Sequence, residues 1–151
     1  MQIRVYAIAK PKEETMDRLA REYFDRCAPF ATLSYHPIMP KNVEKAQRQG
    51  EAMARQSYTD TFVPHLGGYS VILDERGEEP DSLRFSRILE DKNDIRFFIG
   101  GAYGFEENFR QKGQQVIRLS RLTMGHKLAM VVLAEQIYRG LCIIHRHPYH
   151  K

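Results

Sequence analysis

The sequence predicts an α/β protein with a mostly parallel sheet. Short strand-like stretches alternate along the chain with segments of helical periodicity, which is the pattern of a doubly wound sheet. Two of these stretches, 69–73 and 95–99, are almost continuously apolar, as expected for strands covered on both faces. The 151 residues are 42% hydrophobic and 28% charged, ordinary values for a globular protein. We therefore expect residues 1–151 to form a single domain.

The first elements follow from simple periodicities. Alternating residues over 3–8 predict the first strand. Apolar residues at helical spacing predict a helix over 13–28, which Pro29 closes. A second strand is expected over 31–38.

A polar, exposed helix is expected over 43–58. Asn42 is its candidate N-cap, because asparagine side chains accept bonds from free amides at helix starts. Gly50 interrupts this helix, and residues 59–68 fit no single element.

The second half repeats the alternation of strands and helices. It is expected to form, in order, a strand over 69–73, a helix capped by Asp81 or Ser82 and ending at 90, a strand over 95–99, a glycine loop over 100–104, a short helix over 105–112, a strand over 115–119 and a helix over 127–144. The last helix is apolar on nearly all sides, which indicates burial or a subunit interface.

Three strand ends are the places where a ligand is expected. Ligands of open parallel sheets lie beyond the carboxyl ends of the strands, here Leu73, Gly100 and Leu119. The loop GGAYG over 100–104 has neither the spacing of a dinucleotide-binding loop nor the lysine of a P-loop. It fits equally a close approach to a ligand or a tight turn without one.

Positive charge is concentrated in the last third of the chain. Residues 108–151 carry a net charge of +7 and residues 1–107 a net charge of −3, within a total of +4. A basic pole of this kind indicates a polyanion such as nucleic acid, although a solvated basic surface is an equal alternative.

Metal, membrane and disulfide chemistry are not expected. His145, His147 and His150 lie close together, but no fourth protein ligand for zinc accompanies them. No apolar run reaches membrane-spanning length. Cys27 and Cys142 have no redox or metal spacing, so we expect two buried thiols in a reducing cytoplasm.

Several motifs together resemble one family. They are YSVILDERG (69–77), IGGAYGF (99–105), LSRLTMGH (119–126), AEQIYRG (134–140) and HPYHK (147–151). In this combination the chain closely resembles, over its whole length, the RlmH-type methyltransferases of the SPOUT class.

The resemblance implies a fold, a reaction and partners. It implies an α/β domain with a C-terminal trefoil knot, and a homodimer packed through its helices. The implied activity is methyl transfer from S-adenosylmethionine to N3 of a pseudouridine. That base lies in a stem-loop of 23S rRNA in the assembled 70S ribosome.

The resemblance also implies roles for particular residues. The methyl donor would contact Leu73, Gly100, Leu119, Ser120, Arg121, Leu122, Thr123 and Met124. Candidates for catalysis are His126, Tyr149 and His150, and candidates for RNA contact are Arg139, Arg146 and Lys151. In this family the tail of one subunit approaches the donor of the other. Many relatives have proline where this chain has Gly125, so the rigidity of that loop and the role of His126 stay open.

Two other functions stay open. A catalytically silent ribosome-binding protein would keep the basic pole but bind no methyl donor. A small nucleotide-binding enzyme of flavodoxin-like topology would bind a phosphate ligand and ignore ribosomes.

Overall fold

A computed structural model describes residues 1–151, which form one α/β domain. Its strands are β1 (Gln2–Ile8), β2 (Thr32–Ile38), β3 (Tyr69–Glu78), β4 (Asp94–Ile99) and β5 (Gln115–Ile117). Its helices are α1 (Thr15–Arg26), α2 (Lys41–Arg48), α3 (Glu51–Phe62), α4 (Ser82–Leu89), α5 (Glu107–Arg110) and α6 (His126–Ile144), with a short 3-10 turn, η1, at Val63–His65.

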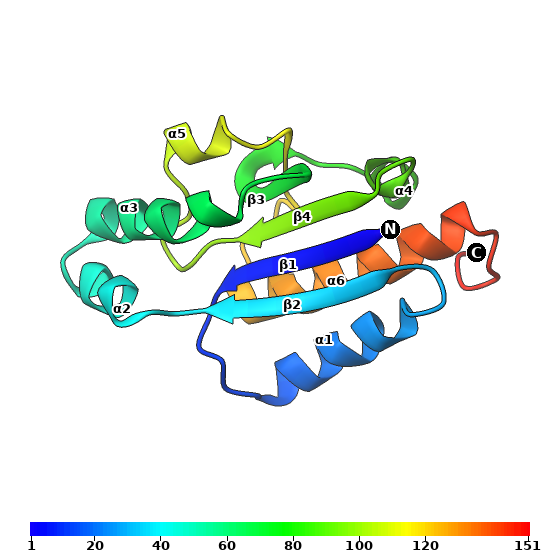
Figure 1. The fold of residues 1–151 in the computed structure, drawn as a ribbon, viewed down its shortest axis with the longest axis horizontal. Coiled ribbons are helices and arrows are strands. Elements are labelled where there is room, and N and C mark those ends of the chain that lie inside the picture. The colour runs from blue at the N-terminus through cyan, green and yellow to red at the C-terminus, as the bar shows by residue number, and fades with distance from the viewer.

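All five strands are parallel, in the order β2-β1-β4-β3-β5 (Figure 1). The predicted parallel α/β sheet is confirmed. The order differs from the flavodoxin-like order 2-1-3-4-5, because β4 lies between β1 and β3. The flavodoxin-like alternative therefore does not describe this chain. The C-terminal trefoil knot stays a prediction of the family resemblance.

The sheet buries apolar residues on both faces, but unequally. Alternate residues of β1 point to opposite faces: Val5 joins a cluster of 24 buried residues, and Tyr6 joins a cluster of 10. Helices α1, α4 and α6 cover the larger cluster, and α2, α3 and α5 cover the smaller one. Almost continuous apolar strands are explained by this double cover.

Helix α6 is the centre of the larger helical layer. It packs against α1 and α4, and nine of its residues are buried. This explains its nearly all-apolar sequence, since α1, α4 and the sheet each cover part of its surface. No helix of the structure is long and apolar enough to cross a bilayer.

Two local predictions in the first half have different outcomes. The predicted interruption at Gly50 is confirmed, because α2 and α3 are separate helices, although α3 runs on to Phe62. The φ of Gly50, +117°, is open mainly to glycine. The predicted N-cap Asn42 is wrong: α2 begins at Lys41, and the Pro40 carbonyl accepts from Val43 N at 3.0 Å.

In the second half, the alternative cap at Asp81 is confirmed, because its side chain accepts from Arg84 N at 2.7 Å. The last strands also differ in length from the prediction. β3 runs on to Glu78 through an irregularity after Leu73. β5 ends at Ile117, so Leu119 lies two residues beyond the strand.

The two cysteines are buried and free, as expected. Burial raises the pKa of the Cys27 thiol to about 12, and the neighbouring Cys142 adds to the shift. Both thiols therefore act as small apolar groups of the core.

Candidate functional site

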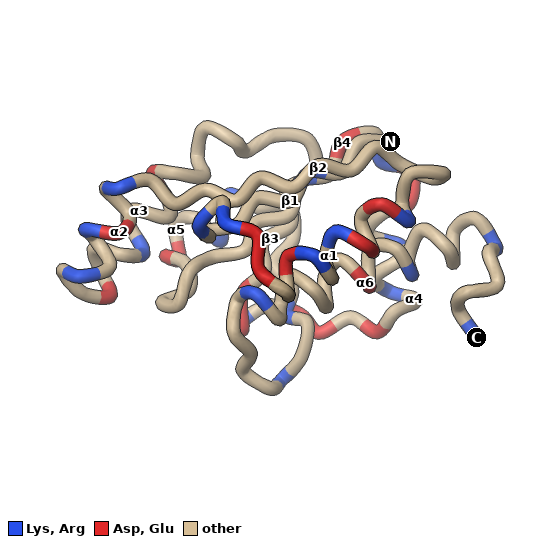
Figure 2. Tube along the Cα trace, turned by 90° about the horizontal axis from the view of Figure 1, so that it is seen from below, with Lys and Arg blue, Asp and Glu red and all other residues tan.

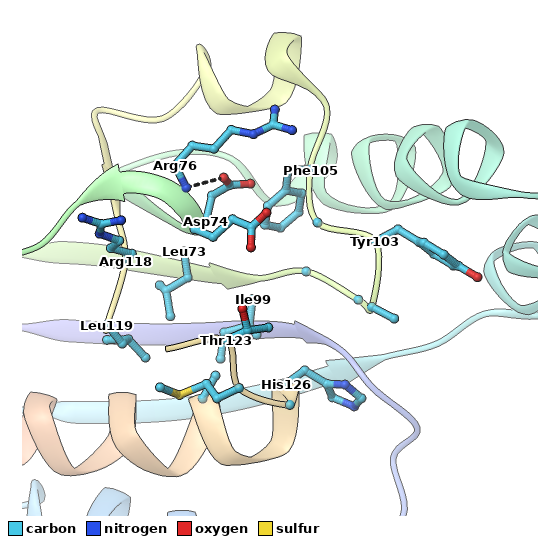
Figure 3. Close-up of a pocket in the computed structure, with 18 of the residues that line it drawn as sticks. Leu73, Asp74, Arg76, Ile99, Tyr103, Phe105, Arg118, Leu119, Thr123 and His126 are labelled. Carbon is cyan, nitrogen blue, oxygen red and sulfur yellow. Dashed lines mark hydrogen bonds between the residues drawn. The ribbon is translucent and has the colours of Figure 1, made fainter. Parts of the chain in front are cut away.

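A cavity of about 610 Å³ lies at the carboxyl end of the sheet. The strand register creates it: Leu73 of β3 is paired with Ile99 of β4 on one side and with Ile117 of β5 on the other. The regular pairing of the three strands therefore ends at one level, where Leu73, Ile99, Leu119 and Thr123 surround a common space (Figure 3). Its size suits a small molecule.

Most residues predicted to contact a methyl donor line this cavity. They are Leu73, Gly100, Leu119, Ser120, Leu122, Thr123 and Met124, and His126 joins them. Arg121 does not line it, since its side chain is 80% exposed and its Nε lies 3.6 Å from Glu79 Oε1. Leu122 is 79% exposed, so the loop carries an uncovered apolar side chain beside the opening.

The glycine loop is tight for reasons of packing. A Cβ at Gly101 would lie 2.4 Å from the hydroxyl of the buried Tyr58. A Cβ at Gly100 would lie 3.1 Å from the ring of the buried Phe105, and Gly104 has a φ of +71°. The loop therefore needs glycine to fold, and its close approach to the cavity comes with that fold.

The start of α6 is held by an ion pair with a residue that is distant in the sequence. His126 is its first residue, and the next residue, Lys127, places Nζ 2.7 Å from Asp17 Oδ1 of α1. Asp17 also accepts from Glu14 N at 2.9 Å, as part of the capping box of α1. This ion pair, which joins residues 110 apart, fixes the end of the loop that borders the cavity.

His126 borders the cavity, and the residue is open to solvent on one side while neighbouring atoms partly cover its ring. Partial burial of its ring lowers the pKa of His126 below 6.5, and the positive charge of Lys127 lowers it further. The ring is therefore neutral at neutral pH and has a nitrogen that can accept a proton.

A buried ion pair forms one wall of the cavity. Asp74 Oδ2 lies 3.6 Å from Arg110 Nη1, with the two side chains 4% and 8% exposed. Arg110 Nη1 also donates to the Phe105 carbonyl at 2.8 Å, which ties the glycine loop to β3. Sequence reasoning missed this pair, because the residues after Leu73 have the composition of a turn.

The C-terminal tail folds back onto α6 and contacts it at Glu135 and Arg139. Tyr149 donates its hydroxyl proton to Glu135 Oε1 at 2.9 Å, and Arg139 Nη2 donates to the same oxygen at 2.6 Å. Arg139 Nη1 also reaches His150 Nδ1 at 3.3 Å. Burial and then the bond to Glu135 raise the pKa of Tyr149 to about 12. Tyr149 is therefore protonated at neutral pH.

The structure does not bring the three catalytic candidates together within one chain. His126 stands at the cavity, whereas Tyr149 and His150 contact Glu135 and Arg139, further along α6. The C-terminus lies near the far end of that helix (Figure 1). A helix rises about 1.5 Å per residue, so Glu135 and Arg139 lie about 14 and 20 Å along α6 from His126.

Comparison with known proteins fits this arrangement. A family model described as "Predicted SPOUT methyltransferase" matches residues 1–150. The chain belongs to the SPOUT methyltransferase family.

Individual SPOUT relatives are similar over their whole length. The chain is 46% identical to a ribosomal RNA large subunit methyltransferase H of Aliarcobacter butzleri and 42% identical to one of Campylobacter concisus. It is 43% identical to the protein of the same name from Helicobacter hepaticus. Each comparison covers 100% of both chains.

The basic pole predicted for residues 108–151 is largely neutralised by acidic side chains in the folded chain. Five of its eight cations form ion pairs: Arg110 with Asp74, Arg118 and Arg121 with Glu79, Lys127 with Asp17, and Arg139 with Glu135. Figure 2 shows acidic and basic residues interspersed along the trace, with only basic ones close to the C-terminus. Arg146 and Lys151 of the tail and Lys112 have no ion pair.

The histidines near the C-terminus pack as aromatic rings in this SPOUT chain. His145 stacks on Phe30 with ring centroids 4.8 Å apart, and His147 meets the same ring edge-on at 6.0 Å. The structure contains no group of three or more His, Cys, Asp or Glu side chains that could hold a metal ion.

Proposed function

We propose that this protein methylates N3 of a pseudouridine in a stem-loop of 23S rRNA, in the assembled 70S ribosome and with S-adenosylmethionine as donor. It would act as a homodimer in the bacterial cytoplasm, where its substrate lies. The observation that carries the proposal is the cavity at three aligned strand ends, in a chain of the SPOUT methyltransferase family.

The residues of the cavity fit such a donor. Leu73, Ile99, Leu119 and Met124 provide apolar walls for an adenine ring. Backbone amides and carbonyls of the glycine loop and of residues 118–125 are available to its polar edge. On the opposite wall, the carboxylate of Asp74 suits a positively charged group. When bound, S-adenosylmethionine supplies a methyl group on a sulfonium sulfur, which leaves as a neutral thioether.

The protein's contribution would be mainly positioning. The Asp17–Lys127 pair holds the start of α6, and the Arg110 bond to the Phe105 carbonyl holds the glycine loop. Both walls are thus fixed before the acceptor base arrives, which favours an in-line transfer. The N3 proton of the base must also leave, and we assign its removal to the neutral His126 at the cavity, whose ring nitrogen can accept a proton. Tyr149, bonded to Glu135, instead has a proton to donate.

A second chain would complete the site. One chain holds its tail far from its own cavity, so an antiparallel pair of α6 helices would place each tail at the partner's cavity. The layer of α1, α4 and α6 offers exposed apolar side chains for such a pair. Its large exposed side chains are Met16, Leu19, Leu83 and Leu128, between 40% and 53% exposed.

The tail would then meet the RNA. Arg146 and Lys151 are its unpaired cations, and they would contact phosphates, while Arg139 would support Tyr149 from beneath its ring at 4.7 Å. Ribosome binding is therefore expected to weaken with added salt, through few phosphate contacts rather than a broad basic face.

The direct test uses ribosomes from a strain that lacks the modification. Purified protein is incubated with radiolabelled S-adenosylmethionine and either intact ribosomes or naked rRNA. Label on 23S rRNA of intact ribosomes only is the expected result. Donor binding without label on either acceptor would contradict the proposed substrate. Ribosome binding without any donor binding would favour the catalytically silent alternative.

A further inference from the structure

The cavity contains one carboxylate oxygen that accepts no hydrogen bond within the chain. Asp74 Oδ1 accepts from Arg76 N at 2.9 Å, a bond drawn in Figure 3. Oδ2 receives no hydrogen bond from the chain, and its ion-pair partner, Arg110 Nη1, stands off at 3.6 Å. The side chain of Asp74 is only 4% exposed, yet it lines the cavity. A carboxylate oxygen can accept several hydrogen bonds, so Oδ2 is free to accept one from a ligand group in the cavity.

The space in front of Oδ2 is kept open by a glycine. A Cβ at Gly104 would meet Asp74 Oδ2 at 3.8 Å as its only near neighbour. Gly104 has a positive φ of +71°, so the loop turns here without placing a side chain against the carboxylate. A ligand group in the cavity can therefore reach Oδ2.

The negative charge of Asp74 is only partly offset. Arg110 divides its guanidinium between three acceptors: Asp74, the Phe105 carbonyl and the carboxylate of Glu107, which its Nη2 contacts closely. Arg76 offers Asp74 its backbone amide, while its side chain extends away from Leu73 and Leu119 in Figure 3. The two remaining cations of the cavity pair with other acids: Arg118 with Glu79 and Arg55 with Glu51. This wall of the cavity therefore favours a cation, and the low dielectric of a buried site strengthens that preference.

We propose that Asp74 is a specificity-determining residue that binds the positive charge of the methyl donor through Oδ2. The inference rests on the proposed function. S-adenosylmethionine carries two positive groups, the sulfonium and the α-ammonium, and Asp74 distinguishes ligands that have the relevant one from those that lack it. If the sulfonium is the partner, Asp74 also helps to release the product, whose sulfur is uncharged.

The test is binding of three ligands by calorimetry to wild type and Asp74→Asn. S-adenosylhomocysteine keeps the ammonium but lacks the sulfonium charge, and 5′-methylthioadenosine lacks both. Asparagine keeps the shape and the bond from Arg76 N but removes the charge. We expect S-adenosylmethionine to bind at least about tenfold more weakly to the variant, as for loss of a charged hydrogen bond. Unchanged binding of S-adenosylhomocysteine then assigns the sulfonium. Equal weakening of both, with 5′-methylthioadenosine unchanged, assigns the ammonium.

Two further variants separate charge from structure. Asp94→Asn also removes an ion-paired aspartate, but Asp94 begins β4 at the opposite end of the sheet, so its three affinities should stay as in wild type. In Asp74→Asn, the guanidinium of Arg110 loses its carboxylate partner. The double variant Asp74→Asn with Arg110→Gln removes that guanidinium as well, and it should keep the ligand selectivity of the single variant.

Other outcomes overturn the inference or the function beneath it. Two results would show that Asp74 acts only by holding Arg110 in place. One is an equal loss of affinity for all three ligands in Asp74→Asn, and the other is wild-type selectivity in the double variant. Unchanged affinities in Asp74→Asn would show that no ligand charge meets Oδ2. A wild-type protein that binds none of the three ligands would instead refute the proposed methyl transfer.

Discussion

The start of α6 and its later residues differ in what they leave unsatisfied. At the start, the cavity walls are held by bonds from distant elements, and Asp74 Oδ2 and the neutral His126 face open space. Where the tail packs, Glu135, Arg139 and Tyr149 satisfy one another. One chain therefore has an open cavity at the start of α6 and a self-supporting cluster of side chains further along it. We propose that this cluster serves catalysis at the cavity of a second subunit.

The largest effect should come from removing the tail. Deletion of residues 147–151 takes away Tyr149, His150 and Lys151 but no atom of the cavity wall. Methyl transfer to ribosomes should become undetectable, while affinity for S-adenosylmethionine should change little, because the tail supplies no wall of the donor cavity. Filter binding and label transfer measure the two quantities. Full activity of the deletion would make the cavity end sufficient by itself.

Replacing His126 should have the next largest effect. If its neutral ring accepts the N3 proton, His126→Asn lowers the rate about 10²-fold or more at neutral pH. The wild-type rate should fall as the pH drops through the lowered pKa of His126, below 6.5, and the variant should lack this limb. A pH–rate profile of the same shape in the variant would exclude His126 as the base.

Stability gives a second reading of the same residue. Because its pKa is lower in the folded chain than its ordinary value, the unfolded chain binds more protons between the two values. Its contribution to the free energy of unfolding is therefore complete above 6.5 and is lost as the pH falls through that window. Urea unfolding of wild type and His126→Asn at several pH values checks this sign.

A side chain in the glycine loop should affect binding and stability together. Valine at Gly100 must displace the ring of Phe105, which lies 3.1 Å from the added Cβ. We expect donor binding to be lost and the free energy of unfolding to fall by about 1–3 kcal/mol, typical of overpacking. Calorimetry and urea unfolding on the same sample measure both. Wild-type affinity for S-adenosylmethionine would show that the donor does not sit beside Gly100.

The smallest effect concerns the loop that closes the cavity. Gly125 has φ −59° and ψ 148°, and no atom lies within 4 Å of an added Cβ. Proline fits this conformation, so Gly125→Pro should raise the free energy of unfolding by about 0.4–1 kcal/mol, by restricting the unfolded chain. Gly50→Ala is the matched contrast: its φ of +117° predicts destabilisation. A destabilised Gly125→Pro would show that the loop needs another conformation.

Sequence alone could predict much of this molecule, but not its pairings. Periodicity predicted the parallel sheet and the buried α6, since both depend on local alternation of apolar residues. Sequence reasoning wrongly placed the N-cap of α2 at Asn42. The actual N-cap is Pro40, and its position depends on how the preceding chain enters the helix. Asp74 and Arg110 lie 36 positions apart and meet only after β3 and α5 have packed.

Charge shows the same limit. The last third has a net charge of +7 in the sequence, yet half of its eight cations meet acids brought by folding from other parts of the chain. Counting charges along the sequence therefore overestimated the basic surface. The tail keeps two cations without an ion pair, Arg146 and Lys151.

The most direct test of the composite site mixes two inactive proteins. Gly100→Val lacks a working cavity and keeps the tail, and the deletion of 147–151 lacks the tail and keeps the cavity. After subunit exchange at equal amounts, mixed dimers should each hold one complete site and restore about a quarter of wild-type methyl transfer. If tagged mixed dimers form and remain inactive, the cavity and the tail do not act across a dimer.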